Sequence, residues 1–162
     1  MNKYKLIMII AVIFSIAIIS KVYANTKTPL SGKVIYLDPG HGGIDSGTTY
    51  KKIYEKDLNL LLSKKLASSL ESHGAIVYLT REKDKDLSLN NVKNRKRSDL
   101  ATRAYLINKT NPDMYISIHL NYISNTKWKG LQIFYNNRIK ENEIIARKLT
   151  KYIREKTYNV KD

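Results

Sequence analysis

Apolar positions recur along the chain with two different periods, which predict strands and helices in alternation. Apolar runs of four to seven residues are typical of buried strands, and apolar residues three or four apart are typical of helices. We expect strands over 33–38, 75–80, 113–119 and 130–135, and helices over 56–73, 95–110 and 139–156. This alternation predicts the α/β class, with three layers and a mostly parallel sheet flanked by helices on both faces.

The leucine spacing within 56–73 supports a helix, and Gly74 suits its C-cap. His73, at the end of this helix, is interpreted as a cap residue, since a cation is favoured there by the helix dipole. In the helix over 95–110 the spacing predicts an inner face. That face is formed by Leu100, Ala104 and Ile107.

The first 24 residues have the pattern of an export segment. A basic start, "MNKYK", precedes the apolar run "LIMIIAVIFSIAIIS", and "VYA" supplies small residues for cleavage after Ala24. We expect residues 1–24 to be a signal peptide, with an uncleaved N-terminal membrane anchor as the alternative. Residues 25–32 then form a linker and 33–162 the catalytic domain. The protein is therefore expected to act outside the cytoplasm.

Composition narrows the possible chemistry and partners. There is no cysteine, which excludes disulfides, thiol nucleophiles and Cys-ligated metals. The formal net charge is +15, and removal of the three lysines within residues 1–24 leaves +12. A basic exported protein is expected to meet anionic wall polymer or a membrane surface rather than nucleic acid, although solvated lysines explain the charge equally well.

Two of the three histidines follow predicted strands directly. His41 comes after "VIYLDPG" and His119 ends "YISIH", so both belong at the carboxyl edge of the sheet, where sites form in such folds. A catalytic zinc commonly has three protein ligands, and without cysteine the third is a carboxylate. Glu55 is the natural candidate, while Asp38 and Asp45 compete with it or orient a ligand imidazole.

The ordered motifs "YLDPGHGGIDSG", "YEKDLNL" and "SIHLN" resemble those of the zinc-dependent N-acetylmuramoyl-L-alanine amidases of the amidase-3 family. The similarity covers residues 31 to about 156. Further stretches resemble a sporulation-specific branch of this family. They are "SGKVIYLDPGHGG", "RKRSDLATRAYLINK", "DMYISIHLN", "WKGLQIFY" and "KENE".

The resemblance implies an amidase/phosphorylase-hydrolase-like fold and a Zn²⁺ cofactor held by His41, Glu55 and His119. It implies hydrolysis of the amide between N-acetylmuramic acid and L-alanine in peptidoglycan, with a zinc-bound water as nucleophile. For the sporulation branch it implies cortex maturation leading to muramic lactam, a role connected with germination. Expected partners are peptidoglycan and an exported accessory protein, with membrane association through the N-terminal segment and no nucleic acid.

One expected element of the family is missing from the 162 residues. The family's general acid/base is a glutamate on a late strand, in a motif like "VE-x-GF", and this sequence ends at "REKTYNVKD" without it. We therefore expect a C-terminally incomplete fold whose metal binding survives better than its catalysis. Glu141, after the fourth predicted strand, is the candidate substitute. The alternative function is a catalytically silent amidase-fold module that binds zinc or cell wall and docks a partner.

Several polar and aromatic residues are candidates for substrate contact. Asn121 follows His119 and is expected to bind substrate or a ligand, with a turn role as the alternative. Trp128 and Tyr122 either stack on substrate or pack beneath their loop. The cations Arg95, Lys96 and Arg97 begin a helix, an unfavourable end for positive charge, and therefore face an anionic group or are simply solvated.

Overall fold

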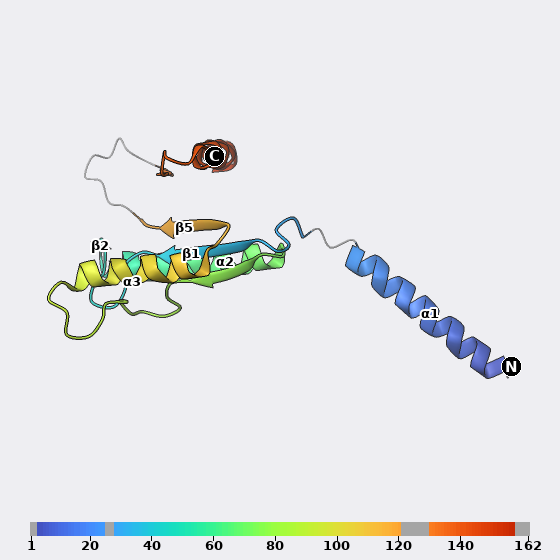
Figure 1. Cartoon of the computed structure of the whole chain (residues 1–162). Coiled ribbons are helices and arrows are strands. Elements are labelled where there is room, and N and C mark those ends of the chain that lie inside the picture. Colours follow the sequence, from blue (N-terminus) through green and yellow to red (C-terminus); the bar gives the residue numbers. More distant parts are fainter. Residues whose placement is uncertain (1–2, 25–27, 121–129, 158–162) are drawn as a thin grey trace. The chain divides into compact units, whose positions relative to one another are not determined.

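The computed structural model describes residues 3–24, 28–120 and 130–157. The chain divides into two compact units, Met1–Asn121 and Tyr122–Asp162 (Figure 1). The first unit contains the sheet and its flanking helices α2 and α3. The second contains a single described helix.

The N-terminal segment is helical. Helix α1 spans Lys3–Ala24, which lies within the predicted export segment of residues 1–24. Of the helices in the described part of the chain, none combines the length and the apolar character needed to cross a membrane. The export signal, its anchor alternative and the linker over 25–32 stay predictions.

Three parallel strands form the sheet that carries the site. Strand β1 (Val34–Pro39) lies in the middle, between β4 (Ile76–Leu79) and β5 (Met114–Ile118) (Figure 1). The register places Leu37 opposite both Leu79 and Ile116. Three of the four predicted strands and the predicted parallel α/β class are thereby confirmed.

Helix α2 (Glu55–Ser72) covers one face of this sheet. The hydrophobic core lies between them. It includes Ile35, Leu37, Val77, Leu79, Met114 and Ile116 from the strands and Leu66, Ala67 and Leu70 from α2. The first half of α2 buries polar side chains instead, namely Glu55, Asn59 and Ser63 at four-residue intervals. Its leucines Leu58, Leu61 and Leu62 are consequently exposed. His73 is the C-cap residue, as predicted, and its Nδ1 donates to the Ser69 carbonyl at 2.7 Å.

Helix α3 (Arg95–Thr110) has the predicted bounds but not the predicted inner face. Leu100 and Ala104 are exposed and Ile107 is only half-buried, so the expected inner face was wrong. The buried residue of α3 is Arg103, whose guanidinium reaches Asp38 on β1 at 2.5 Å. Successive side chains of a strand point to opposite faces, so Asp38 lies on the face opposite that of Leu37. A buried ion pair, rather than an apolar stripe, thus decides which side of α3 faces the sheet.

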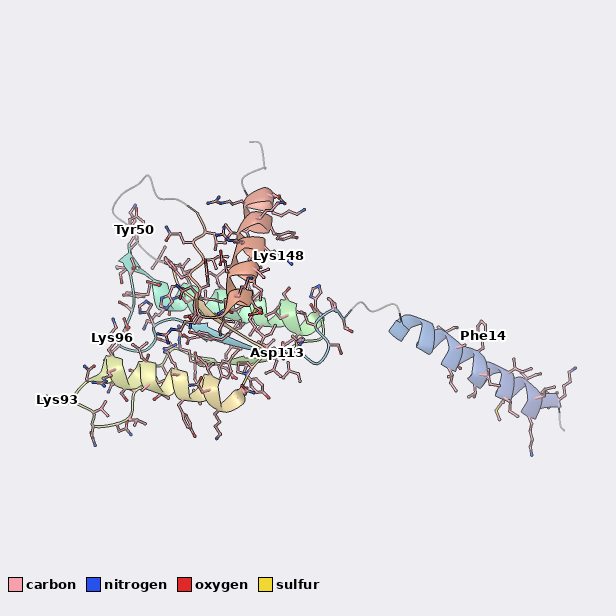
Figure 2. The ribbon with its side chains drawn as sticks, turned by 45° about the horizontal axis from the view of Figure 1, so that its top comes forward. Phe14, Tyr50, Lys93, Lys96, Asp113 and Lys148 are labelled. Atoms are coloured by element: carbon pink, nitrogen blue, oxygen red, sulfur yellow. The ribbon has the colours of Figure 1, made fainter. Side chains whose placement is uncertain are left out.

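A small hairpin leads into α2. Strands β2 (Thr49–Tyr50) and β3 (Ile53–Tyr54) pair in antiparallel fashion, and Tyr50 lies at the turn (Figure 2). Lys51 and Lys52 both adopt left-handed backbone conformations, as a two-residue hairpin turn with right-handed strand twist requires. Because the hairpin ends at Tyr54, it fixes where Glu55 begins the helix.

In the second unit, the predicted strand over residues 130–135 was wrong. Residues 130–135 are described and form no strand, although an apolar run predicted one. Leu131, Phe134 and Tyr135 are exposed there. Within the described part of this unit no neighbouring strand pairs with the segment, and an isolated strand leaves its backbone groups unsatisfied. Helix α4 spans Lys140–Thr157, close to the predicted 139–156.

A pair of leucine truncations tests the core that the structure assigns. Leu37 is fully buried, so Leu37→Ala is expected to lower the free energy of unfolding by about 2–5 kcal/mol. Leu100 is 57% exposed, so Leu100→Ala is expected to cost less than about 0.5 kcal/mol. Urea unfolding of the two variants measures both values. Comparable losses for the two leucines would contradict the observed orientation of α3.

Candidate metal centre

His41 lies just beyond β1 in an unusual backbone conformation. Its φ is +63°, in the left-handed region, which costs a residue with a Cβ roughly 1–2 kcal/mol. The glycines that follow, Gly42 and Gly43, also have positive φ and turn the chain away from the sheet edge. The loop thereby points the His41 imidazole back over the strand ends, where its side chain is only one-fifth exposed.

His119 occupies the corresponding position beyond β5. Since β1 and β5 are parallel neighbours, their carboxyl ends meet at the same edge, and the Gly40 N–H donates to the Ile118 carbonyl at 3.0 Å. A Cβ at Gly40 would overlap the His119 imidazole. The two imidazoles lie edge to face, with ring centroids 4.8 Å apart. The predicted meeting of the two histidines is confirmed.

Glu55 completes the group from the first turn of α2. Its Oε1 lies 3.3 Å from His41 Nε2 and 3.1 Å from His119 Nδ1, and the residue is only 5% exposed. Gly47 leaves the space for this approach, because a Cβ there would come within 2.6 Å of the His41 ring and 2.8 Å of Glu55 Oε2. His41, Glu55 and His119 are referred to below as the trio.

The surroundings of Glu55 keep its carboxylate charged. Burial alone raises the pKa of Glu55, but donation from the Thr48 and Leu120 N–H groups, each at 2.9 Å, and the nearby His41 outweigh it. The pKa of Glu55 is lowered to about 2. Asn59 Nδ2 donates to the same carboxylate at 3.4 Å. The trio therefore contains a fixed negative charge at neutral pH.

Asp45 orients the first imidazole. Its Oδ2 lies 3.0 Å from His41 Nδ1, so Nδ1 carries the hydrogen in a neutral ring and Nε2 remains free as a ligand atom. Burial raises the pKa of Asp45, but His41, the Gly47 N–H and Lys96 lower it overall. Asp38, the other candidate, lies away from the imidazoles in its ion pair with Arg103. Of the two proposed alternatives, only Asp45 contacts His41.

The trio has the donor set and spacing that a small divalent cation needs. One ligand atom from each side chain lies within 4.8 Å of the others. Bond lengths of 2.0–2.1 Å in a tetrahedron place ligand atoms about 3.3 Å apart, which compares with 3.1 and 3.3 Å for the two Glu55–imidazole contacts. Two imidazoles and a carboxylate leave a fourth position for water or substrate.

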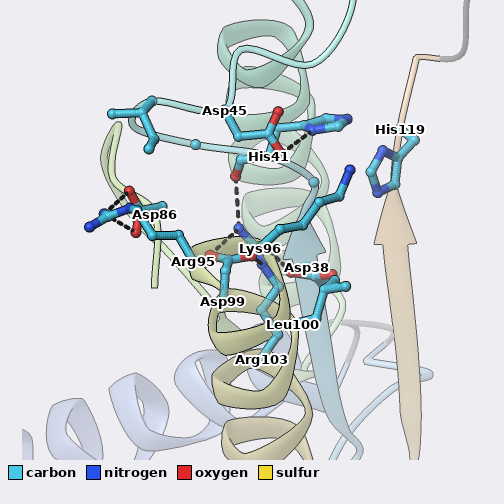
Figure 3. A pocket seen from close by; sticks show the side chains of 13 residues that line it. Asp38, His41, Asp45, Asp86, Arg95, Lys96, Asp99, Leu100, Arg103 and His119 are labelled. Carbon is cyan, nitrogen blue, oxygen red and sulfur yellow. Dashed lines mark hydrogen bonds and ion pairs between the residues drawn. The ribbon is translucent and has the colours of Figure 1, made fainter. Parts of the chain in front are cut away.

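A cavity of about 470 Å³ adjoins the imidazoles of the trio (Figure 3). Its other wall comes from α3, where Arg95 binds Asp86 at 2.7 Å. Lys96 points into the cavity from the first turn of α3, and among the described residues it makes no ion pair (Figure 3). Of the three cations that begin this helix, Arg95 is therefore neutralised within the protein and Lys96 is available to a ligand.

Not every predicted site residue can be placed beside the trio. Asn121, Tyr122 and Trp128 lie outside the described residues. Glu141 is in the first turn of α4, which belongs to the second unit. Their proposed roles stay predictions.

Three buried polar residues around the site were missed by sequence reasoning. Asn59 and Arg81 both donate to the Gly40 carbonyl, at 3.2 and 3.0 Å, and Arg103 donates to the His41 carbonyl at 2.8 Å. Asn59 could have been found from its place one helical turn after Glu55. Arg81 and Arg103 carry no signal in a sequence rich in exposed cations.

The sequence relatives of the chain are cell-wall amidases. Residues 35–161 match the family described as N-acetylmuramoyl-L-alanine amidase. The germination-specific N-acetylmuramoyl-L-alanine amidase of Bacillus subtilis is 45% identical over 134 residues, which cover 81% of this chain and 56% of that protein. The probable cell wall amidase LytH of Staphylococcus aureus is 36% identical over 113 residues, covering 67% of this chain and 33% of LytH. The chain thus spans about half the length of these relatives or less.

Solved structures support the same assignment. The CwlD amidase from Clostridioides difficile, in complex with the GerS lipoprotein, superposes with a TM-score of 0.68 at 36% identity, covering 79% of this chain and 70% of that one. An N-acetylmuramoyl-L-alanine amidase from Clostridium difficile 630 gives a TM-score of 0.60 at 32% identity, covering 76% and 63%. By sequence and by fold, the chain belongs to the N-acetylmuramoyl-L-alanine amidase family.

Proposed function

We propose that the protein is a zinc-dependent hydrolase of the amide bond between N-acetylmuramic acid and L-alanine in peptidoglycan. The observation that carries this proposal is the convergence of His41, Glu55 and His119 at the carboxyl edge of the sheet, beside a cavity. The family is generally zinc-dependent, which favours zinc over other small cations. The 45% identity to a germination-specific amidase supports spore-cortex peptidoglycan, with muramic lactam as the eventual product, as the substrate context.

The residues around the proposed metal site have separate parts in the proposed reaction. When bound, zinc supplies a Lewis acid that activates water and polarises the amide carbonyl. His41 presents Nε2 because Asp45 holds its Nδ1–H, and Glu55 brings the negative charge that offsets the cation. Lys96, with no ion pair among the described residues, is proposed to meet an anionic group of the stem peptide in the cavity. Asn121 keeps its proposed role in binding substrate.

The leaving amine also needs a proton. Glu141 is the proposed general acid/base, since it follows the 130–135 segment and lies in the first turn of α4. The trio belongs to the first unit and Glu141 to the second. Metal binding by the trio is therefore expected to survive a substitution of Glu141.

The alternative function, a module that binds zinc or cell wall without catalysis, has one observation in its favour. The carboxylates that line the cavity are Asp38, Asp45, Asp86 and Asp99. Each already binds a cation or an imidazole, so among the described residues that line the cavity no free carboxylate is available as the acid. A module that binds zinc or wall without turnover would have this composition.

The proposed place of action is outside the cytoplasm. The cell-wall amidase relatives act on an extracytoplasmic polymer, and residues 1–24 are proposed to direct export or to tether the protein to the membrane. An exported accessory protein is a proposed partner, because the C. difficile relative was solved with a lipoprotein.

Removal of one imidazole is expected to abolish stoichiometric metal binding. In His119→Ala the trio keeps only two ligands, so zinc content after dialysis should fall from about one per chain to nearly zero. His73→Ala, which removes the cap histidine instead, serves as the matched control and should retain zinc. Elemental analysis by mass spectrometry measures the content. Undiminished zinc in His119→Ala would remove the proposed site.

A methyl group at Gly47 is expected to weaken zinc binding through steric overlap. In Gly47→Ala the new Cβ meets the His41 ring and Glu55, whereas in Gly32→Ala it meets nothing within 4 Å. Both glycines have positive φ, +61° and +76°, so the two variants share the backbone strain and differ in the overlap. Competition with a chelating dye should show a higher zinc Kd for Gly47→Ala alone. Equal values for the two variants would mean that the trio does not hold the metal.

Turnover is expected to depend on Glu141 as well as on the trio. With zinc bound, the protein should release stem peptides from purified cortex peptidoglycan, generating new L-alanine amino termini. Glu141→Gln should lower kcat by about 10²–10⁴-fold while zinc content stays unchanged, with Glu143→Gln on the same helix turn as control. Full zinc loading without any release would favour the silent module, and equal kcat values for the two variants would exclude Glu141.

A further inference from the structure

Two buried guanidinium groups donate hydrogen bonds to the backbone at the end of β1. Arg81 donates from Nε to the Pro39 carbonyl and from Nη2 to the Gly40 carbonyl, both at 3.0 Å. Arg103 donates from Nη1 to the same Pro39 carbonyl at 2.9 Å and from Nη2 to the His41 carbonyl at 2.8 Å. Three consecutive carbonyl oxygens are thus held by two arginines that are 1% and 4% exposed.

Arg103 is the member of this pair that contacts a proposed metal ligand directly. Its guanidinium is fixed from two other sides, by Asp38 Oδ1 at 2.5 Å and by Asp99 Oδ2 at 2.7 Å (Figure 3). Asp38 is in turn held by the Thr80 hydroxyl at 2.6 Å and the Ser117 hydroxyl at 3.0 Å. The donor that meets the His41 carbonyl therefore has little freedom to move.

The position of the His41 carbonyl depends on the same backbone conformation that points the His41 imidazole at Glu55. His41 has φ +63°, a conformation that a residue with a Cβ avoids unless its surroundings impose it. A return to a relaxed conformation would rotate the His41 peptide, take its carbonyl away from Arg103 Nη2 and swing Nε2 away from Glu55 Oε1. One hydrogen bond thus opposes the movement that would dismantle the trio.

We propose that Arg103 is a positioning residue for the metal centre: it holds His41 in the left-handed conformation that lets its Nε2 act as a metal ligand. This inference rests on the proposed function, because it takes the trio as the metal site. It means that Arg103 on α3, which contributes no ligand atom, sets the metal affinity of His41 in the loop after β1.

A merely structural role for Arg103 makes a different prediction. If Arg103 only fastened α3 to the sheet through Asp38 and stabilised the helix through Asp99, weakening these contacts would lower stability without changing the intrinsic metal affinity of the folded protein. If Arg103 positions His41, loss of its guanidinium also lowers the metal affinity of the folded protein, in addition to any effect on stability. Groups that orient metal ligands typically contribute 10–100-fold in affinity.

The test compares two conservative variants of the full chain. Arg103→Lys keeps a cation beside Asp38, but a single ammonium cannot also reach the Pro39 and His41 carbonyls as the fork does. Asp99→Asn weakens the α3 ion pair and leaves the contact between Arg103 and His41 in place. For each protein the measurements are the Zn²⁺ Kd by chelator competition, the visible absorption spectrum with Co²⁺, and the unfolding midpoint without metal.

The expected result is a Zn²⁺ Kd raised about 10–100-fold in Arg103→Lys, with an altered Co²⁺ spectrum. Asp99→Asn should show a lowered unfolding midpoint together with an unchanged spectrum and a Kd within about twofold of wild type. An Arg103→Lys protein with the wild-type Kd and spectrum would overturn the inference. Equal Kd increases in the two variants would also overturn it, because Asp99→Asn leaves the contact between Arg103 and His41 in place.

A second variant covers the case in which Arg103→Lys does not fold. Asp38→Asn/Arg103→Met replaces the buried ion pair by neutral side chains of similar size, an exchange that proteins often tolerate, and still removes the donor to His41. The same weakened Kd and altered spectrum are expected, and wild-type values would overturn the inference. Failure of the wild-type chain itself to bind Zn²⁺ would instead refute the proposed function, and the inference with it.

Discussion

The parallel pairing of β1 with β5 is the constraint on which the rest of this structure depends. The carboxyl ends of parallel neighbouring strands lie at the same edge of the sheet. His41 and His119, which follow β1 and β5, therefore meet even though they are 78 positions apart in the chain. The Gly40 N–H to Ile118 carbonyl bond extends the ladder one step past the strands and fixes the two histidine-bearing turns against each other. Without this pairing the two imidazoles would not meet, and His41 and Glu55 would lack the third ligand of the proposed metal site.

Buried charge is distributed around this edge in a consistent way. Glu55 on one face of the sheet is held by backbone N–H groups and by Asn59, and Asp38 on the other face is held by Arg103 and by hydroxyls. Burying a charge is costly unless it is paired and hydrogen-bonded, and both carboxylates meet that condition. At this edge of the sheet, polar contacts that fix side-chain positions therefore take the place of apolar packing. Such contacts position the side chains of a site but contribute less to stability than an apolar core would.

The sequence was sufficient to predict the parallel sheet, the helix over 95–110 and the meeting of the two histidines, because these follow from periodicity and strand direction. It was not sufficient to predict the face of α3, since the leucine pattern pointed to Leu100 whereas the buried ion pair of Arg103 determines the packing. The apolar run over 130–135 likewise predicted a strand, and a strand also needs a neighbour, which no local pattern reveals. Arg81 and Arg103 look like any of the 29 lysines and arginines until the fold places their guanidinium groups against carbonyls.

The central claim is that two imidazoles and one carboxylate bind a single zinc ion, and X-ray absorption at the zinc edge of the loaded protein tests it most directly. The account predicts four light scatterers at about 2.0–2.1 Å, with the outer-shell scattering characteristic of two imidazole rings. An octahedral shell made only of oxygen, without imidazole scattering, would contradict it.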